Sequence, residues 1–209
     1  IEYGIPKSAR EEVNPTSQIS VIMNFLINYM LFSMIFIATD VTALKSQRIL
    51  HRMHAMPISP AHMFGGQVMA FLGLLCAQIM EIMIVIYLVL GVPLSSHILL
   101  STLILLLMSG VILSFGLLVT RMTDNTGIVP LICNGIAVPL MMISGTFMPV
   151  DHHPIMSKLK VLSPQYWVVD AIAVLNAGSH RIGIHVLVLA VMGVTVFSIA
   201  IAGRKVSLS

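Results

Sequence analysis

Long apolar windows are the feature of this sequence that most limits how the chain can fold. Five of them lie at about 19–39, 67–90, 98–120, 127–147 and 182–203. Each holds about the 20 residues that an α-helix needs to cross a hydrocarbon core roughly 30 Å thick. Inside that core every peptide N–H and C=O must be hydrogen-bonded within the protein, so such windows fold as helices. The sequence therefore predicts an all-α, polytopic transmembrane helical bundle of about five spans.

The composition supports a membrane location and excludes several other classes. Of the 209 residues, 57% are hydrophobic and 9% are charged, against about 25% charged residues in soluble domains. The formal net charge of +3 is too small and too local to indicate a nucleic-acid partner. Cys76 and Cys133 both lie in apolar windows, so they indicate neither a disulfide framework nor a metal site. Membrane lipid is the expected surrounding.

The positive charges predict an orientation. With the N-terminus outside, the inner segments hold six Lys and Arg residues, mostly close to span ends, and the outer segments hold five. Positive residues in short cytoplasmic segments set membrane topology. We therefore expect a multi-pass protein of a bacterial plasma membrane, with this chain's N-terminus outside and its C-terminus in the cytoplasm. The chain starts without Met and without a signal-peptide pattern, which indicates a piece of a longer protein.

The segment KSQRILHRMHAMPISP, residues 45–60, gathers positive charge between the first two windows. On a helical wheel Lys45, Arg48 and Arg52 fall within about 60° of one another, beside an apolar stripe. The pattern predicts a short amphipathic cytoplasmic helix at about 42–56. Two interpretations stay open: an interfacial helix on anionic headgroups, and a docking surface for a cytoplasmic partner.

Prolines punctuate the chain at the expected helix boundaries. Pro57 ends the amphipathic helix. Asn14-Pro15, Ser59-Pro60 and Ser163-Pro164 each place an N-cap side chain before a proline at the first helical position.

The long outer connection at about 148–181 holds two short helical pieces, around 155–162 and 165–175. The second is apolar but too short to span, so we expect a re-entrant or interfacial helical hairpin. Tyr166 and Trp167 would anchor it at headgroup level.

Glu81 is the carboxylate that lies inside a span, past its midpoint, with Gln78 one turn earlier on the same face. A charge within a span is costly, so Glu81 is expected to face the bundle interior or a cavity. It is either a substrate-contact or proton-linked group, or a residue that hydrogen-bonds between helices.

Asparagines occupy two other windows, at Asn24, Asn28 and Asn134. Amides inside spans are more often partners in interhelical hydrogen bonds than ligands. Asp151-His152-His153 contains zinc-ligand residue types, but adjacent residues rarely converge on one ion, so a capped turn is favoured and no metal site is expected.

Three features together resemble the ABC-2 type permeases, the membrane subunits of ATP-driven exporters. Residues 50–67, LHRMHAMPISPAHMFGGQ, are similar to that family's coupling segment. Residues 143–172, ISGTFMPVDHHPIMSKLKVLSPQYWVVDAI, resemble its outer stretch. Asn14-Pro15 fits the junction after an extracellular domain.

The resemblance implies a domain plan, partners and residue roles. Residues 1–18 would end an extracellular region, and 19–209 would form spans two to six of a six-span half-transporter. An ABC ATP-binding subunit would hold ATP and Mg²⁺, a second permease copy would complete a homo- or heterodimer, and this chain would bind no cofactor. The implied ATPase-coupling residues are Lys45, Arg48, Arg52, Met56 and Pro57. The candidate pathway residues are Glu81, Gln78, Asn24, Asn28 and Asn134, and the outer gate would contain Pro164, Tyr166 and Trp167.

Two functions follow. The first is the permease of an exporter that moves an amphipathic or lipid-like compound, such as a drug, an antibiotic or a peptide. It has no catalytic residues, since the chain contains no Gly-x-x-x-x-Gly-Lys-Ser/Thr loop for ATP. The alternative is a proton-coupled secondary transporter that uses Glu81. A membrane enzyme is disfavoured, because paired His or Glu ligands at helical spacing are absent from the spans.

Overall fold

The structure is a computed structural model that describes residues 15–46, 60–88, 98–146, 155–178 and 181–202. These residues form helices and turns, without a strand among them. The helices are α1 (Pro15–Ser46), α3 (Pro60–Leu88), α4 (Ile98–Met122), α5 (Val129–Ser144), α6 (Met156–Leu159), the 3₁₀ turn η2 (Lys160–Leu162), α7 (Pro164–Asn176) and α8 (Gly183–Ala202). The prediction of an all-α helical bundle is confirmed.

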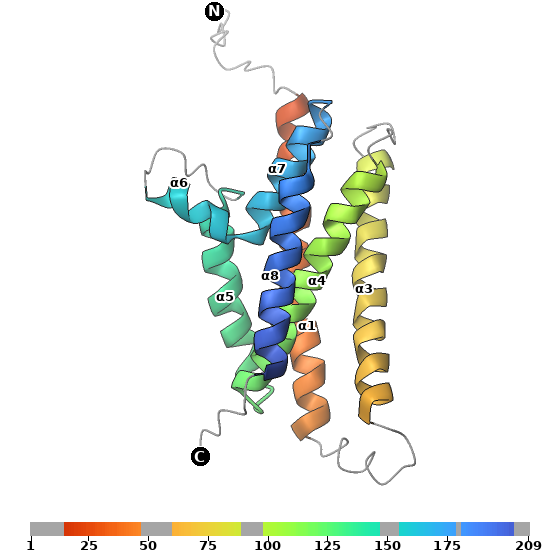
Figure 1. The fold of residues 1–209 in the computed structure, drawn as a ribbon, viewed down its shortest axis with the longest axis vertical. Coiled ribbons are helices and arrows are strands. Elements are labelled where there is room, and N and C mark those ends of the chain that lie inside the picture. Colours follow the sequence, from red (N-terminus) through yellow and green to blue (C-terminus); the bar gives the residue numbers. More distant parts are fainter. Residues whose placement is uncertain (1–14, 47–59, 89–97, 147–154, 179–180, 203–209) are drawn as a thin grey trace, which may run out of the picture.

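The long helices run side by side, and α4 lies at their centre (Figure 1). It packs against α1, α3, α5, α7 and α8. Its buried side chains include Ile104, Met108 and Ile112, all fully enclosed by the bundle. By contrast, α3 and α8 bury only one side and leave wide apolar faces exposed, as helices in contact with lipid do.

The two ends of the bundle differ. At one end, α1 and α8 begin, and α6 and α7 lie nearby; we call this the α7 end (Figure 1). At the other end, α1, α4 and α8 finish, while α3 and α5 begin; we call this the Lys45 end.

Four of the described helices are long and apolar enough to cross a membrane by length and composition: α1, α3, α4 and α8. The fourth predicted window, 127–147, is shorter in the structure. α5 has 16 residues and is therefore about 24 Å long, less than a full hydrocarbon core. It starts after a turn in which the Asn125 side chain accepts a hydrogen bond from Gly127 N, and it ends at Gly145 with φ 77°. That left-handed conformation suits glycine and terminates helices.

The first span is longer than predicted. α1 continues past Thr39 to Ser46, because Val41 and Thr42 still pack into the bundle and the sequence offers no breaker before that point. Residues 42–46 of the expected amphipathic helix are thus the last turns of α1. Residues 47–56 lie outside the described part of the chain.

Helices α1 and α4 approach each other closely at Gly116. A Cβ atom added there would lie 2.8 Å from Ile37 Cγ2 and 3.4 Å from the Met34 carbonyl oxygen. Ile37 and Met34 are fully buried, so neither can move aside without disturbing the core. Gly116 therefore lets the two helices meet closely, which is the usual role of small residues between membrane helices.

We predict that Gly116→Ala lowers the stability of the folded chain by about 1–3 kcal/mol, the usual cost of overpacking. The matched control is Gly110→Ala on the same helix, where an added Cβ would meet no atom within 4 Å. Thermal unfolding in detergent would measure both. Equal Tm values for the two variants would contradict the close contact between α1 and α4.

Candidate functional site: a groove between α1 and α5

An apolar groove of about 600 Å³ runs between α1 and α5. Its lining comes from one face of each helix, because the α1 positions follow an i, i+3, i+4, i+7 spacing and the α5 positions an i, i+3, i+4 spacing. The lining residues are Phe25, Asn28, Tyr29, Phe32, Val138, Met141 and Met142. Aromatic rings and flexible thioethers thus form most of the surface, which can adapt to apolar ligands of varied shape.

The groove is open along one side. Phe25 is 61% exposed, and Tyr29 and Met142 are each 53% exposed. Large apolar side chains at this level of exposure form a surface that lipid, a ligand or another protein chain can cover.

A polar cluster ties α1 to the end of α5. The Asn28 amide nitrogen donates to Thr146 Oγ1 at 3.1 Å, and the same hydroxyl lies 3.2 Å from Asn28 Oδ1. Ser144 Oγ lies 2.6 Å from Thr146 Oγ1 and also bonds the Met141 carbonyl oxygen at 2.7 Å. Asn28 is only 3% exposed, so these bonds satisfy its amide inside the protein. The interhelical role predicted for Asn28 is present here, at the edge of the groove.

Asn24 lies one turn before Asn28 on α1. Its buried Oδ1 has no hydrogen-bond partner among the described residues. An unsatisfied buried acceptor of this kind is a place for a water molecule or a ligand donor.

Lys45 ties α1 to α4 at the opposite end of the bundle. Its ammonium group donates to the carbonyl oxygen of Thr120, in the last turn of α4. Carbonyl groups in a last helical turn lack partners within the helix, and a cation there is favoured by the helix dipole. In the structure Lys45 bonds α4, and its predicted role in coupling to an ATP-binding subunit stays a prediction.

Helices α6 and α7 begin close to the predicted positions, but α7 lacks the predicted N-cap hydrogen bond. α7 starts at Pro164 after an extended Ser163, yet the Ser163 side chain does not cap the helix. Its hydroxyl donates to Gln165 Oε1 instead. The predicted side-chain cap is therefore wrong: the Ser163 hydroxyl bonds the Gln165 side chain and caps no backbone N–H of α7.

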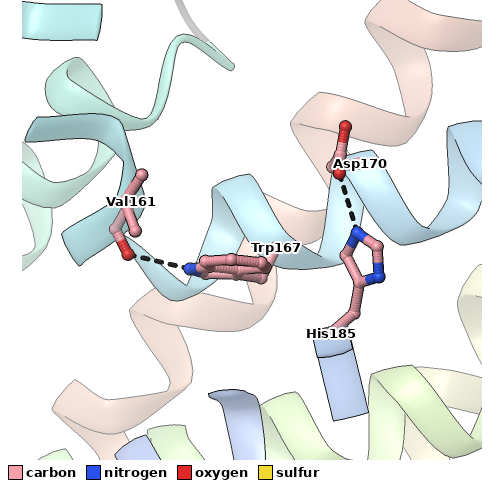
Figure 2. Close-up of polar contacts among 4 residues, drawn as sticks. All are labelled: Val161, Trp167, Asp170 and His185. Atoms are coloured by element: carbon pink, nitrogen blue, oxygen red, sulfur yellow. Dashed lines mark hydrogen bonds and ion pairs between the residues drawn. The ribbon is translucent and has the colours of Figure 1, made fainter. Parts of the chain in front are cut away.

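Trp167 joins the parts of the α6–α7 hairpin, residues 155–178. Its indole N–H donates to the Val161 carbonyl oxygen at 2.8 Å, which links α7 to η2 (Figure 2). The Tyr166 ring meets it edge-on at 5.5 Å. One turn further along α7, Asp170 Oδ2 lies 2.7 Å from His185 Nε2 of α8. The two predicted aromatic residues thus lie in the hairpin.

The structure separates Gln78 from Glu81. Gln78 is buried and accepts a hydrogen bond of 2.8 Å from Ser33 Oγ, joining α3 to α1. We expected Glu81 to face the bundle interior or a cavity. In the structure of this chain it is instead exposed on α3. Residues three apart on a helix differ by about 60° in direction, and the border of the buried face passes between these two.

The predicted pathway residues therefore do not form one site. Asn134 is exposed and donates to the Pro130 carbonyl oxygen of its own helix at 2.8 Å. Of the five predicted residues, Asn28 alone lines the groove. The described residues contain no group of three or more His, Cys, Asp or Glu that could hold a metal ion. Residues 151–153 lie outside the described part of the chain, as do Arg48, Arg52, Met56 and Pro57.

Sequence reasoning missed most of the groove lining and the bond between Asp170 and His185. A signal for the groove was present, because Phe25, Tyr29 and Phe32 recur at helical spacing around Asn28. Such a stripe has the same pattern as an ordinary lipid-facing surface, so it does not distinguish the two.

Comparison with known proteins gives one match. The family model described as "ABC-2 type transporter" matches residues 4–175, which is most of the 209-residue chain. No curated protein and no solved structure matches significantly.

We predict that Asn28→Ala destabilises the folded chain by about 1 kcal/mol, since the interhelical contact with Thr146 is lost while Thr146 keeps its bond with Ser144. Asn134→Ala, which removes an exposed bond within α5, should change stability by less than about 0.5 kcal/mol. Thermal unfolding of both, with Thr146→Val and the double variant, would give the coupling energy of Asn28 and Thr146. A coupling energy of zero would contradict the contact.

Proposed function

Since this chain belongs to the ABC-2 type transporter family, we propose that it is the permease of an exporter. The exported compound would be amphipathic or lipid-like, such as a drug, an antibiotic or a peptide. As the family's membrane domain, it is a multi-pass permease of an ABC transporter. ATP would be bound and hydrolysed with Mg²⁺ by a separate ATP-binding subunit, while this chain supplies the path. The observation that carries the proposal is the groove between α1 and α5.

The groove has the chemistry and size that such a compound needs. A volume of about 600 Å³ falls within the 300–1,000 Å³ typical of small-molecule sites. Its aromatic and methionine side chains suit the apolar part of the compound, while Asn24 Oδ1 nearby offers an acceptor for a polar group.

The open side of the groove supports a dimer. Phe25, Tyr29 and Met142 would be covered if a second permease copy faced them, and two grooves would then enclose one central path. A closed two-fold arrangement is the commonest symmetry of protein assemblies.

The path from the ATPase to the groove runs along α1. From Phe32 in the groove, α1 continues without interruption for 13 residues, about 20 Å, to Lys45. The bond from Lys45 to Thr120 then makes α4 follow the end of α1. In this proposal the Lys45 end is cytoplasmic, and Arg48, Arg52, Met56 and Pro57 dock on the ATP-binding subunit directly beyond it.

We predict that Met142→Trp abolishes stimulation of ATP hydrolysis by amphipathic compounds in the assembled transporter, because the larger ring fills the groove. Stimulation is measured against each variant's own rate without compound. Leu131→Trp, at an exposed position on the same helix but outside the groove, should remain stimulated. Equal stimulation of both variants would remove the groove from the transport path.

We also predict that charge reversal at Arg48 and Arg52 to Glu prevents the permease from retaining its ATP-binding subunit. The test is co-purification of the full-length parent protein from gently solubilised membranes, followed by mass spectrometry. Lys158→Glu, an exposed charge reversal at the opposite end, is the control and should retain the subunit.

If the unaltered, monodisperse protein brings no companion with a phosphate-binding loop, the segment after α1 belongs on the lipid surface. A transporter driven by a proton gradient, with Glu81 as its carboxylate, would then be the function to test.

A further inference from the structure

A buried histidine near the start of α8 takes no part in the proposed transport path. His185 has 6% of its side chain exposed, and its Nε2 lies 2.7 Å from Asp170 Oδ2, whose side chain is 43% exposed. In Figure 2 the carboxylate of α7 and the imidazole of α8 point directly toward each other.

The two ring nitrogens of His185 have different surroundings. Because an ionised carboxylate only accepts hydrogen bonds, Nε2 carries the hydrogen of the contact with Asp170. Nδ1 is buried and has no hydrogen-bond partner among the described residues. In the neutral ring Nδ1 is an acceptor; a proton added there turns it into a donor and gives the ring a charge opposite to that of Asp170. A proton at Nδ1 would therefore turn this hydrogen bond into an ion pair between the ring and Asp170.

The pair lies where it can position the α6–α7 hairpin. Val168, Ala171 and Leu175 bury one face of α7 in the bundle, while Asp170 reaches α8 from another face. The Trp167 ring meets the His185 ring edge-on at 5.6 Å. Through the bond of Trp167 to Val161, one connected set of contacts runs from η2 across α7 to α8.

The charged and titratable groups of the surrounding elements are few. On α7 and η2 they are Asp170, Tyr166 and Lys160, with the Lys160 ammonium 5.1 Å from the Tyr166 ring centre. Two further charged residues flank these helices in the sequence: Lys158 lies in α6, and Arg181 precedes α8. The described groups on the other packed helices are Tyr29, Asp40 and Lys45 of α1, Arg121 of α4 and Cys133 of α5. Asp170 is the one described carboxylate hydrogen-bonded to the imidazole.

We propose that Asp170 and His185 form a proton-binding site that positions the α6–α7 hairpin against α8. The proton binds at His185 Nδ1, the positive ring is held by the Asp170 carboxylate, and the orientation of α7 follows the occupancy of this site. That the hairpin faces the outside of the cell rests on the proposed function; the binding of the proton does not.

Trp167 makes the site measurable without a cargo or an ATPase. It is the only tryptophan in the 209 residues, so the intrinsic emission at long wavelength reports this one position. A charged imidazole quenches a neighbouring indole more strongly than a neutral one. Emission of the purified chain in detergent should therefore fall in one step as the pH is lowered from 8 to 5, the range in which histidines titrate.

Two variants identify the groups. His185→Gln keeps an amide donor for Asp170 but cannot titrate, so the step should be lost. Asp170→Asn removes the charge that holds the positive ring, so α7 should lose its fixed position and Trp167 should become more accessible to an aqueous quencher at pH 7. Lys158→Met, a nearby charge that no contact joins to the pair, should leave the step in place.

A step that persists in His185→Gln, or the absence of any step in the unaltered chain, would overturn the proposal. If His185→Gln fails to fold, as judged by circular dichroism and gel filtration, the accessibility of Trp167 to the quencher in Asp170→Asn decides alone, and an unchanged accessibility would overturn the proposal. None of these results bears on the ATP-binding subunit, so the permease function and the proton site can fail separately.

Discussion

The fold depends on one constraint: inside a bilayer, the backbone has no water to bond and must satisfy its own hydrogen bonds. The described part of the chain meets this constraint with four long apolar helices. Since apolar side chains gain little by leaving lipid, close packing must hold these helices together. That packing centres on α4. Gly116 of α4 lies against Ile37 of α1. Val111 of α4 lies close to Gly193 of α8, where an added Cβ atom would be 3.5 Å from Val111 Cγ2. A few buried polar bonds, such as the bond from Ser33 to Gln78, fix the pairing.

The short helix α5 creates the groove on which the proposed function rests. Because α5 stops at Ser144 and Gly145, it leaves room at the α7 end that the α6–α7 hairpin occupies, with Val168 and Ala171 fully buried. The same short helix packs on α1 with a groove between them, and Asn28 and Thr146 close the contact at its edge. The groove, the hairpin and the Lys45 end are thus joined through α1, which contacts α3, α4, α5 and α7.

Much of this architecture could be predicted from sequence, because hydropathy and proline are strong local signals. The apolar windows located the spans, and Pro60 and Pro164 marked the starts of α3 and α7. Details that depend on neighbours could not be predicted. The bond from Ser163 to the Gln165 side chain and the bond from Lys45 to Thr120, 75 residues away, both depend on the folded arrangement of their neighbours. Gln78 and Glu81 differ by so little on a helical wheel that only the packed position of α3 separates them. The groove needed both helices in place before its lining could be recognised.

The central claim is that ATP hydrolysis on a partner subunit changes the groove between α1 and α5. The most direct test is to place spin labels at Tyr29 and Met142, two exposed groove positions on the facing helices, in the assembled transporter. Their distance distribution would be measured by pulsed electron paramagnetic resonance without nucleotide and with ATP trapped by vanadate. The account predicts that trapping shifts the distribution to a second, distinct distance. An unchanged distribution in a complex that hydrolyses ATP would contradict it.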